Sequence, residues 1–206
     1  MRHRALIFNA ALAFLVCMTA AVGAQTSKEW NDWGNDAYYD GDYERAIECY
    51  TKLIEQEPDL VIGYQYRGWA YCGLERFEDA IADYTTASEM DPEYRDLYID
   101  RGDAYGVLGR HDEAITDYTT AVEMDPSVSD GYAARALEYY RMGDVTSALD
   151  DIDTGMGLDP ECADCYYVRG LIYRDGGKTK KAKNDFAAAC DLGLEEACGA
   201  LDELEK

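Results

Sequence analysis

The hydrophobic and polar positions of this chain repeat with a period of 34 residues. The segment YTTASEMDP, which starts at Tyr84, recurs as YTTAVEMDP from Tyr118, and the same frame aligns all four prolines as the ends of successive units. Self-similarity at a fixed period of this length is typical of solenoid proteins. We therefore divide the chain into five units, with places numbered from the first residue of each: 27–60, 61–94, 95–128, 129–162 and 163–194.

Small and aromatic residues recur at fixed places within the units. Place 8 is glycine in every unit except the fourth, place 20 is always alanine, and aromatic residues hold place 4 throughout and places 11 and 24 in most units. Places 4, 8 and 11 and places 20, 24 and 27 make two stripes with the period of about 3.6 residues of an α-helix. Each unit is therefore predicted to be a pair of antiparallel amphipathic helices, joined at turn glycines such as Gly41, Gly109 and Gly143.

A pair of opposite charges follows the same period. Place 7 is arginine and place 23 is aspartate in units two to five, whereas unit one has Trp33 and Cys49 there. Their joint presence and joint absence predict an Arg–Asp pair within each unit, although a pair with the neighbouring unit would also lie at the right height. An anion site on these arginines is less favoured, because each arginine has an acid to neutralise it.

These offsets resemble those of the tetratricopeptide repeat, whose pattern is Trp-x-x-Leu-Gly-x-x-Tyr, then alanine, an aromatic residue and proline. The five units cover nearly all of the chain after residue 24, and residues 195–206 resemble a capping helix. We therefore predict an all-α fold, a right-handed α-solenoid of five helix-turn-helix units with a C-terminal capping helix. The resemblance implies that the first helices line a concave groove, which holds a peptide or a segment of a partner.

The resemblance also implies which residues line this groove, and here they are mainly acidic and aromatic. The residues carried over are Asn31, Asn35, Tyr38, Tyr39, Gln65, Trp69, Asp96, Ile99, Asp103, Asp130, Tyr140, Asp164 and Tyr167. We expect Trp69, with Asp96, Asp103 and Asp130, to bind a basic, partly apolar segment, because aromatic side chains make good contact residues. The alternative is that the aromatic residues pack between repeats and that the acids only keep the protein soluble.

The first residues predict export. Arg2 and Arg4 precede an apolar run, and Val22 and Ala24 stand at the small-residue positions before a signal-peptidase cut. We expect cleavage after Ala24 and a periplasmic or secreted protein with no membrane span, with an uncleaved anchor as the alternative. The chain from residue 25 has 17 basic and 42 acidic residues, a net charge of −25. This charge disfavours nucleic acid as a partner and favours a basic protein or peptide.

Catalytic motifs are missing from the sequence. His111 is the single histidine after residue 24, and it stands at place 17, where a turn-filling role is expected. The chain has no Ser-His-acid arrangement, no phosphate-binding glycine loop and no H-E-x-x-H motif. We therefore predict a non-enzymatic scaffold or adaptor with no cofactor and no catalytic residue.

The cysteines near the C-terminus are compatible with either disulfides or a metal site. Cys162 and Cys165 stand at the seam between units four and five, and the segment ACDLGLEEAC is similar to the cysteine-rich Sel1-like repeats. That similarity implies a Cys190–Cys198 disulfide. Since paired helices run antiparallel, the four cysteines could gather at one end, which permits two disulfides or a zinc site of four thiolates. We expect disulfides in an oxidising compartment; the alternative function is a thiol redox or zinc-responsive protein.

Overall fold

The structure is a computed structural model of the chain, and it describes residues 25–204. The predicted signal segment 1–24 and residues 205–206 of the predicted cap lie outside the described residues. Within 25–204 the chain is all-helical, as predicted, with no strand. The helices are α2 (Ser27–Tyr39), α3 (Tyr43–Gln56), α4 (Val61–Gly73), α5 (Phe77–Met90), α6 (Arg95–Val107), α7 (His111–Met124), α8 (Ser129–Arg141), α9 (Val145–Leu158), α10 (Ala163–Asp175), α11 (Thr179–Asp191) and α12 (Glu195–Leu204).

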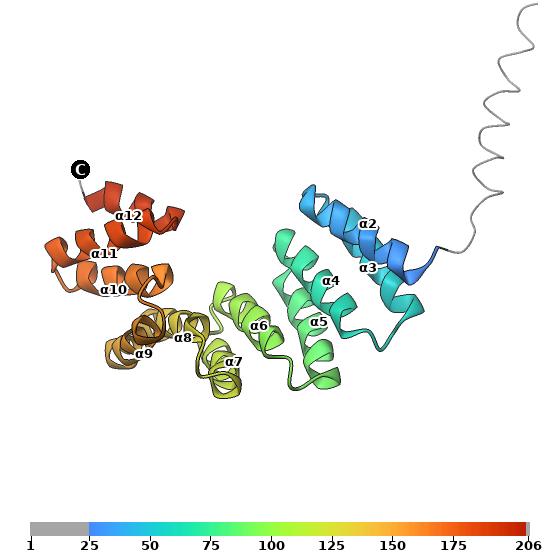
Figure 1. Cartoon of the computed structure of the whole chain (residues 1–206), viewed down its shortest axis with the longest axis horizontal. Helices are drawn as coiled ribbons and strands as arrows, with labels where there is room; N and C mark the ends of the chain where they lie inside the picture. The colour runs from blue at the N-terminus through green and yellow to red at the C-terminus, as the bar shows by residue number, and fades with distance from the viewer. Residues whose placement is uncertain (1–24, 205–206) are drawn as a thin grey trace, which may run out of the picture.

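Successive helix pairs stack into a curved solenoid (Figure 1). Each first helix packs against its own second helix, and each second helix packs against the first helix of the next unit. At the C-terminal end α12 packs on α11, where Leu201 and Leu204 contact the core cluster that contains Leu171 and Phe186. The predicted solenoid with a C-terminal capping helix is confirmed. None of the helices in the described part of the chain has the length and apolar character that crossing a bilayer requires.

Places 8 and 24 are complementary in size, and this lets the two helices of a unit approach closely. A Cβ atom added to Gly102 would lie 2.7 Å from the ring of Tyr118, so a larger residue cannot stand there without moving the ring. Unit four has Ala136 at place 8 and the smaller Ile152 at place 24, and both are fully buried. The alanine is therefore accommodated in the one unit that lacks the aromatic ring.

Tyrosine at place 4 joins each unit to the turn before it. The hydroxyl groups donate to the carbonyl oxygens of the prolines that close the preceding units, at 3.1 to 3.4 Å. Unit one has Trp30 at this place and no closing proline before it. The periodic prolines and tyrosines thus supply the acceptor and the donor of one hydrogen bond between neighbouring units.

The turn within each unit requires one residue in the left-handed region. Gly41, Gly109 and Gly143, the predicted turn glycines, have φ angles of 77°, 70° and 81°. Glu75 takes the same place in unit two, with a φ of 57°. Glycine adopts this conformation without the steric cost that a side chain adds, which explains its recurrence here.

Candidate binding groove

The Arg–Asp pairs form within each of units two to five, and the arginines also reach the preceding unit. Nε and Nη2 of Arg67 each donate to one carboxylate oxygen of Asp83 at 2.7 Å, and Nη1 donates to Thr51 of the preceding unit at 3.2 Å. We call the aspartates in these pairs the seam carboxylates, since the arginine that pairs with each of them also contacts the second helix of the preceding unit: Asp83, Asp117, Asp151 and Asp185. The bidentate pairing neutralises buried charge within a unit, and the further contact of the arginine joins neighbouring units.

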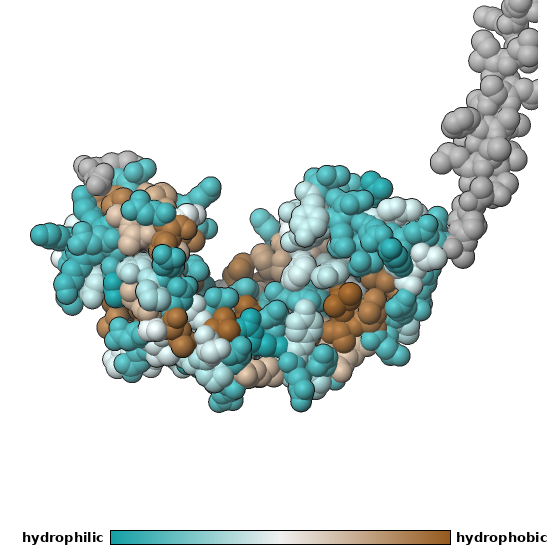
Figure 2. Space-filling view, in the orientation of Figure 1, coloured by the Kyte–Doolittle hydropathy of each residue, from teal (hydrophilic) through white to brown (hydrophobic). Residues whose placement is uncertain are grey.

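The first helices line three adjoining recesses, with volumes of about 310, 290 and 410 Å³. Trp69 and Asp100 belong to the first two, whereas Ile99 and Asp130 belong to the second and third, so the recesses form one continuous surface. We call this surface the groove. Figure 2 shows the molecule hollowed between its two halves.

The structure brings together part of the predicted groove residues. Those that line the three recesses are Tyr38, Gln65, Trp69, Asp96, Ile99, Asp103, Asp130 and Asp164. Those that lie outside the three recesses are Asn31, Asn35, Tyr39, Tyr140 and Tyr167. In this second group Asn35 accepts a hydrogen bond from Tyr50 at 2.9 Å, and Tyr140 donates to Asp175 at 2.6 Å.

Asp100 stands at the centre of the groove, although it is not among the predicted residues. Burial raises the pKa of its carboxyl group to about 6, and hydrogen bonds from Gln65 and Trp69 only partly oppose this shift. Gln65 is itself buried, with 1% of its surface exposed, and it accepts a hydrogen bond from Tyr94 at 2.9 Å while donating to Asp100 at 2.8 Å. Gln65 therefore positions Asp100 instead of offering a contact surface.

Further acids extend the negative charge along the groove. Burial raises the pKa of Asp103, with Glu138 and Asp164 adding to the shift and a hydrogen bond from Tyr118 opposing it. Burial also raises the pKa of Asp164, to which Asp130 adds. These carboxyl groups resist ionisation mainly because they are buried, and the negative charge of the neighbouring acids adds to this effect.

Aromatic rings gather at the N-terminal end of the groove. The ring centroids of Tyr38 and Trp69 lie 6.4 Å apart, and those of Tyr66 and Trp69 lie 5.1 Å apart. Cys72 is a free thiol in the first recess, 3.6 Å from the hydroxyl of Tyr84. This end therefore combines flat apolar walls with the carboxylates of α6.

Glu138 is a buried carboxylate with the basic side chains of His111 and Arg141 beside it. One oxygen lies 2.6 Å from Nδ1 of His111, and the other accepts from Arg141 at 2.6 Å. The sequence predicts a turn-filling role for His111, whereas the structure uses this residue to join α7 to α8. Gly106 makes the space for this contact, because a Cβ atom there would lie 2.8 Å from the Glu138 carboxylate.

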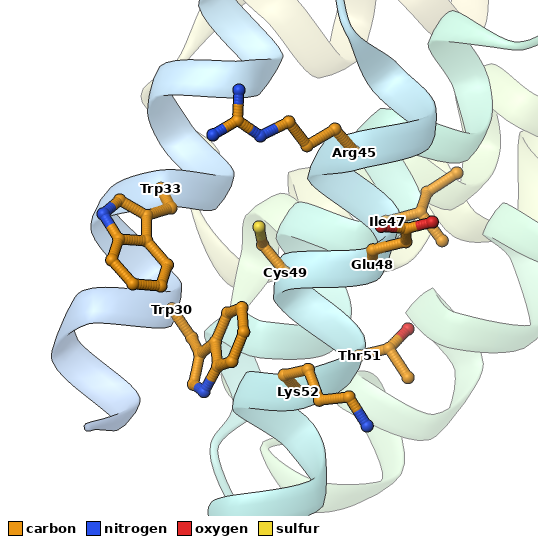
Figure 3. Close-up of a pocket in the computed structure, with 8 residues that line it drawn as sticks. All are labelled: Trp30, Trp33, Arg45, Ile47, Glu48, Cys49, Thr51 and Lys52. Atoms are coloured by element: carbon orange, nitrogen blue, oxygen red, sulfur yellow. The ribbon is translucent and has the colours of Figure 1, made fainter. Parts of the chain in front are cut away.

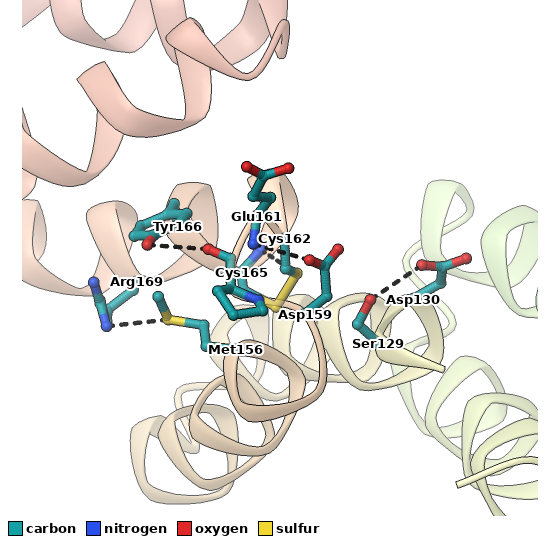
Figure 4. The surroundings of a disulfide bond; sticks show 10 residues. Ser129, Asp130, Met156, Asp159, Glu161, Cys162, Cys165, Tyr166 and Arg169 are labelled. Carbon is teal, nitrogen blue, oxygen red and sulfur yellow. Dashed lines mark hydrogen bonds between the residues drawn. A yellow bond between two sulfur atoms is a disulfide. The ribbon is translucent and has the colours of Figure 1, made fainter. Parts of the chain in front are cut away.

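Two close cysteine pairs lie in the C-terminal part of the described chain, at different places. Cys162, the N-cap residue of α10, and Cys165, in the first turn of α10, have their sulfur atoms at disulfide bonding distance (Figure 4). A Cβ atom on Gly155 would lie 2.7 Å from the sulfur of Cys165, so this glycine makes room for the pair. Cys190 and Cys198 join α11 to α12, with Cα atoms 4.8 Å apart.

The zinc alternative does not fit this arrangement. Within residues 25–204 no group of three or more His, Cys, Asp and Glu side chains is placed to hold a metal ion. The four C-terminal cysteines thus form two separate pairs and not one four-thiolate cluster. Cys49 and Cys72 are free, and they do not bridge.

A separate cavity of about 530 Å³ lies at the N-terminal end, between α2 and α3 (Figure 3). Its lining includes Trp30, Trp33 and Cys49, and the two indole rings pack edge to face at 5.2 Å. Trp33 and Cys49 occupy the places of the Arg–Asp pair, so the departure of unit one from the pattern is the sequence signal for this cavity. No predicted groove residue lines it.

Comparisons with known proteins agree with this architecture. Two family models, both described as tetratricopeptide repeat, match residues 27–60, 66–129 and 133–193. The resemblance to Sel1-like repeats is not confirmed by these matches. A search of curated proteins finds no match.

Solved structures with the same fold share little sequence with this chain. MamA is 23% identical, with a TM-score of 0.68 over 83% of this chain and 93% of MamA. YrrB, described as a TPR protein with an unusual peptide-binding site, is 22% identical, with a TM-score of 0.64 over 88% and 96%. A tetratricopeptide repeat protein from Parabacteroides merdae is 20% identical, with a TM-score of 0.73 over 97% and 79%.

Proposed function

The chain belongs to the tetratricopeptide repeat family and is a protein–protein interaction scaffold of that type, and we propose that its groove binds a basic, partly apolar segment of a partner. The observation that carries this proposal is the row of carboxylates along three connected recesses, beside the apolar side chains of Trp69, Ile99 and Leu137. A segment with alternating basic and apolar residues complements both features.

The charge of the groove points to a cationic ligand. The recesses contain Arg95 and Arg141, but Arg95 is paired with Asp96 at 2.7 Å and Arg141 with Glu138 at 2.6 Å. Burial, with the charge of neighbouring acids, raises the pKa values of Asp100, Asp103 and Asp164, so a cation placed among them gains favourable interactions with several carboxylates at once. Family precedent supports a peptide, because the relative YrrB is described as having a peptide-binding site.

Charge reversal tests this proposal directly. The variant Asp96→Lys/Asp103→Lys/Asp130→Lys should lose binding of an acetylated, amidated Lys-Leu-Arg-Leu-Lys peptide, measured by isothermal titration calorimetry. The matched control is Glu78→Lys/Glu89→Lys/Glu123→Lys, which makes the same change in net charge at exposed positions on α5 and α7. We expect a loss of at least about 30-fold in the groove variant and about threefold or less in the control, because long-range charge is screened by salt.

Two outcomes of this titration contradict the proposal. Equal losses of peptide affinity in both variants mean that binding depends only on the net charge of the protein. No loss in a groove variant that keeps its helical circular dichroism spectrum means that the peptide binds elsewhere. Trp69→Ala provides a second variant without a charge change, and it should weaken the same peptide because the indole offers a large rigid contact surface.

Export and the two disulfides also belong to the proposal. We expect intact mass spectrometry of the protein recovered from an envelope fraction to show a chain that starts at Gln25. Under non-reducing conditions the masses should show Cys162–Cys165 and Cys190–Cys198 linked and Cys49 and Cys72 free. Burial of both Cys162 and Cys165 weighs against the thiol redox alternative, since a reactive thiol has to be accessible.

A further inference from the structure

The chain already contains an arginine-binding arrangement that it uses four times. In each seam pair a guanidinium group meets an aspartate through two parallel hydrogen bonds and lies near the face of a tyrosine ring. Arg67 and Asp83 show this with Tyr64 and Tyr71, whose ring centroids lie 5.8 and 5.9 Å from the guanidinium carbon. Carboxylate and aromatic face together suit the planar, delocalised charge of arginine.

The first recess of the groove has the same two components but no cation. Asp100 and Asp103 provide the carboxylates from α6, and Trp69 and Tyr38 provide the aromatic faces from α4 and α2. The hydrogen bonds that Asp100 and Asp103 accept come from neutral groups, namely Gln65 and Trp69 for the former and Tyr118 for the latter. No lysine or arginine among residues 25–204 forms an ion pair with either.

We propose that this recess is a pocket for one arginine side chain of the partner. Its volume of about 310 Å³ exceeds what a single arginine side chain fills, and it opens into the second recess, where the rest of a peptide continues. The guanidinium group lies between the carboxylates and donates to Asp100 and Asp103, while its face stacks on Trp69. This inference rests on the proposed function of the groove and names the residue that anchors the ligand.

Arginine fits this site better than lysine. The two carboxylates stand three residues apart on α6, so they face the recess from neighbouring turns of one helix. A forked donor can reach both, and a planar group can stack on the indole, whereas an ammonium group is a point charge with a tightly held hydration shell. The pocket should therefore select arginine over lysine and over the neutral isostere citrulline.

Cys72 is a native reporter in the wall of this pocket. Its thiol lines the first recess, whereas Cys49, the other free thiol among residues 25–204, lines the cavity at the N-terminal end. In a Cys49→Ala background, alkylation by N-ethylmaleimide followed by mass spectrometry of the peptide that contains Cys72 reports on this thiol. An occupied pocket slows this reaction because the ligand covers the sulfur.

The test compares peptides that differ at one position. Acetylated, amidated Gly-Leu-Arg-Leu-Gly should protect Cys72 with an affinity about tenfold higher than the same peptide with citrulline, and about threefold higher than the peptide with lysine. Asp100→Asn should reduce the ratio between arginine and citrulline to about one, because asparagine keeps the acceptor for Gln65 and loses the charge. Glu89→Gln, an equal charge change at an exposed position on α5, should leave that ratio at about tenfold.

Failure of the pocket is distinguishable from failure of the groove. Arginine and citrulline peptides that bind equally overturn the pocket and leave the groove intact, and a lysine peptide that equals arginine overturns the guanidinium selectivity. A second experiment uses arginine amide, a single residue, to test the pocket without the rest of a peptide. Suppose that arginine amide protects Cys72 in wild type but not in Asp100→Asn, and that no peptide binds more tightly than arginine amide. The arginine pocket is then supported, and the proposal that the groove binds a peptide is contradicted.

Discussion

The seam carboxylates and the carboxylates of the groove are the same residue type in two opposite settings. Asp117 is buried at a seam and accepts two hydrogen bonds from Arg101 at 2.8 Å. Asp100 lies at the centre of the groove with neutral donors only, and burial raises its pKa to about 6. The seam supplies its own cation for each acid, whereas the groove does not.

This difference separates residues that hold the solenoid together from residues available to a ligand. An acid that already has a bidentate arginine has nothing to gain from a partner, because its charge is neutralised within the protein. An acid whose ionised form is poorly solvated and unpaired gains most from a cation that a ligand brings. Variants at the two sites should therefore change stability in opposite directions.

Loss of a seam arginine should have the largest effect. Arg101→Ala leaves the buried Asp117 without a cation, and breaking a buried pair from one side should lower the free energy of unfolding by about 3 kcal/mol. Urea titration followed by circular dichroism measures this loss. Lys52→Ala is the control, because the side chains of Lys52 and Glu55 are 50% and 55% exposed and removal of such a pair costs about 0.5 kcal/mol or less. Equal losses in both variants would contradict a structural role for the seam.

The neutral variant Asp100→Asn should instead stabilise the protein at pH 7. The pKa of Asp100 is raised from 3.8 to about 6 in the folded state, so the folded state binds more protons than the unfolded state between these values. The contribution of this group to stability is therefore present at low pH and is lost as pH rises toward 6. We expect a gain of about 1 to 2 kcal/mol at pH 7 that disappears near pH 4.

Asp117→Asn is the matched change at a seam, and it should destabilise at pH 7 because it leaves Arg101 without its carboxylate. Thermal unfolding of the two variants at pH 7 and pH 4 measures both effects. The comparison between seam and groove is wrong if the two asparagine variants shift the melting temperature in the same direction at pH 7.

Peptide binding in the groove should weaken as pH falls through about 6. The charged groups that face Asp100 are Asp96 and Asp103 on its own helix, Asp130 from α8, and Arg95, which is paired with Asp96. A cationic ligand favours the ionised carboxyl group, so protonation of Asp100 competes with binding. We expect the affinity of the arginine peptide to fall about fivefold from pH 7 to pH 5 in wild type and much less in Asp100→Asn. A loss of equal size in both proteins would assign the pH dependence to other acids.

The fold and the seam follow from the sequence, because both repeat. Five units repeat one pattern, so each helix pair is supported by several independent occurrences, and Arg67 with Asp83 recurs in three further units. The absence of both charges from unit one links the two places, and the structure forms that pair. Glycine at place 8 and an aromatic residue at place 24 likewise match because one ring fills the space that one missing side chain leaves.

The centre of the groove does not repeat, and this is why it is harder to predict. Asp100 stands at place 6, where units two, four and five have Tyr66, Ala134 and Val168 but unit one also has an acid, Asp32, so an acid at this place does not by itself mark the groove. Place 10 is similar, since Glu138 stands there in unit four and Asp36 in unit one, whereas units two, three and five have alanine or isoleucine. Which carboxylates share a recess, and which arginine reaches each of them, depends on the curvature of the solenoid and is not encoded in any local pattern.

Substitution of Asp96 should have the smallest effect, because Asp96 shares the second recess with Asp100 but is exposed and has Arg95 as a partner of its own. Its side chain is 52% exposed and lies 2.7 Å from Arg95. Asp96→Asn should therefore change the free energy of unfolding by less than about 0.5 kcal/mol, since exposed ion pairs contribute little. The same variant should weaken the arginine peptide by only about twofold, measured by calorimetry at pH 7, because water and Arg95 already screen this charge. A loss as large as that of Asp100→Asn would show that the ligand senses the summed charge of the groove and that the unpaired state of Asp100 has no special role.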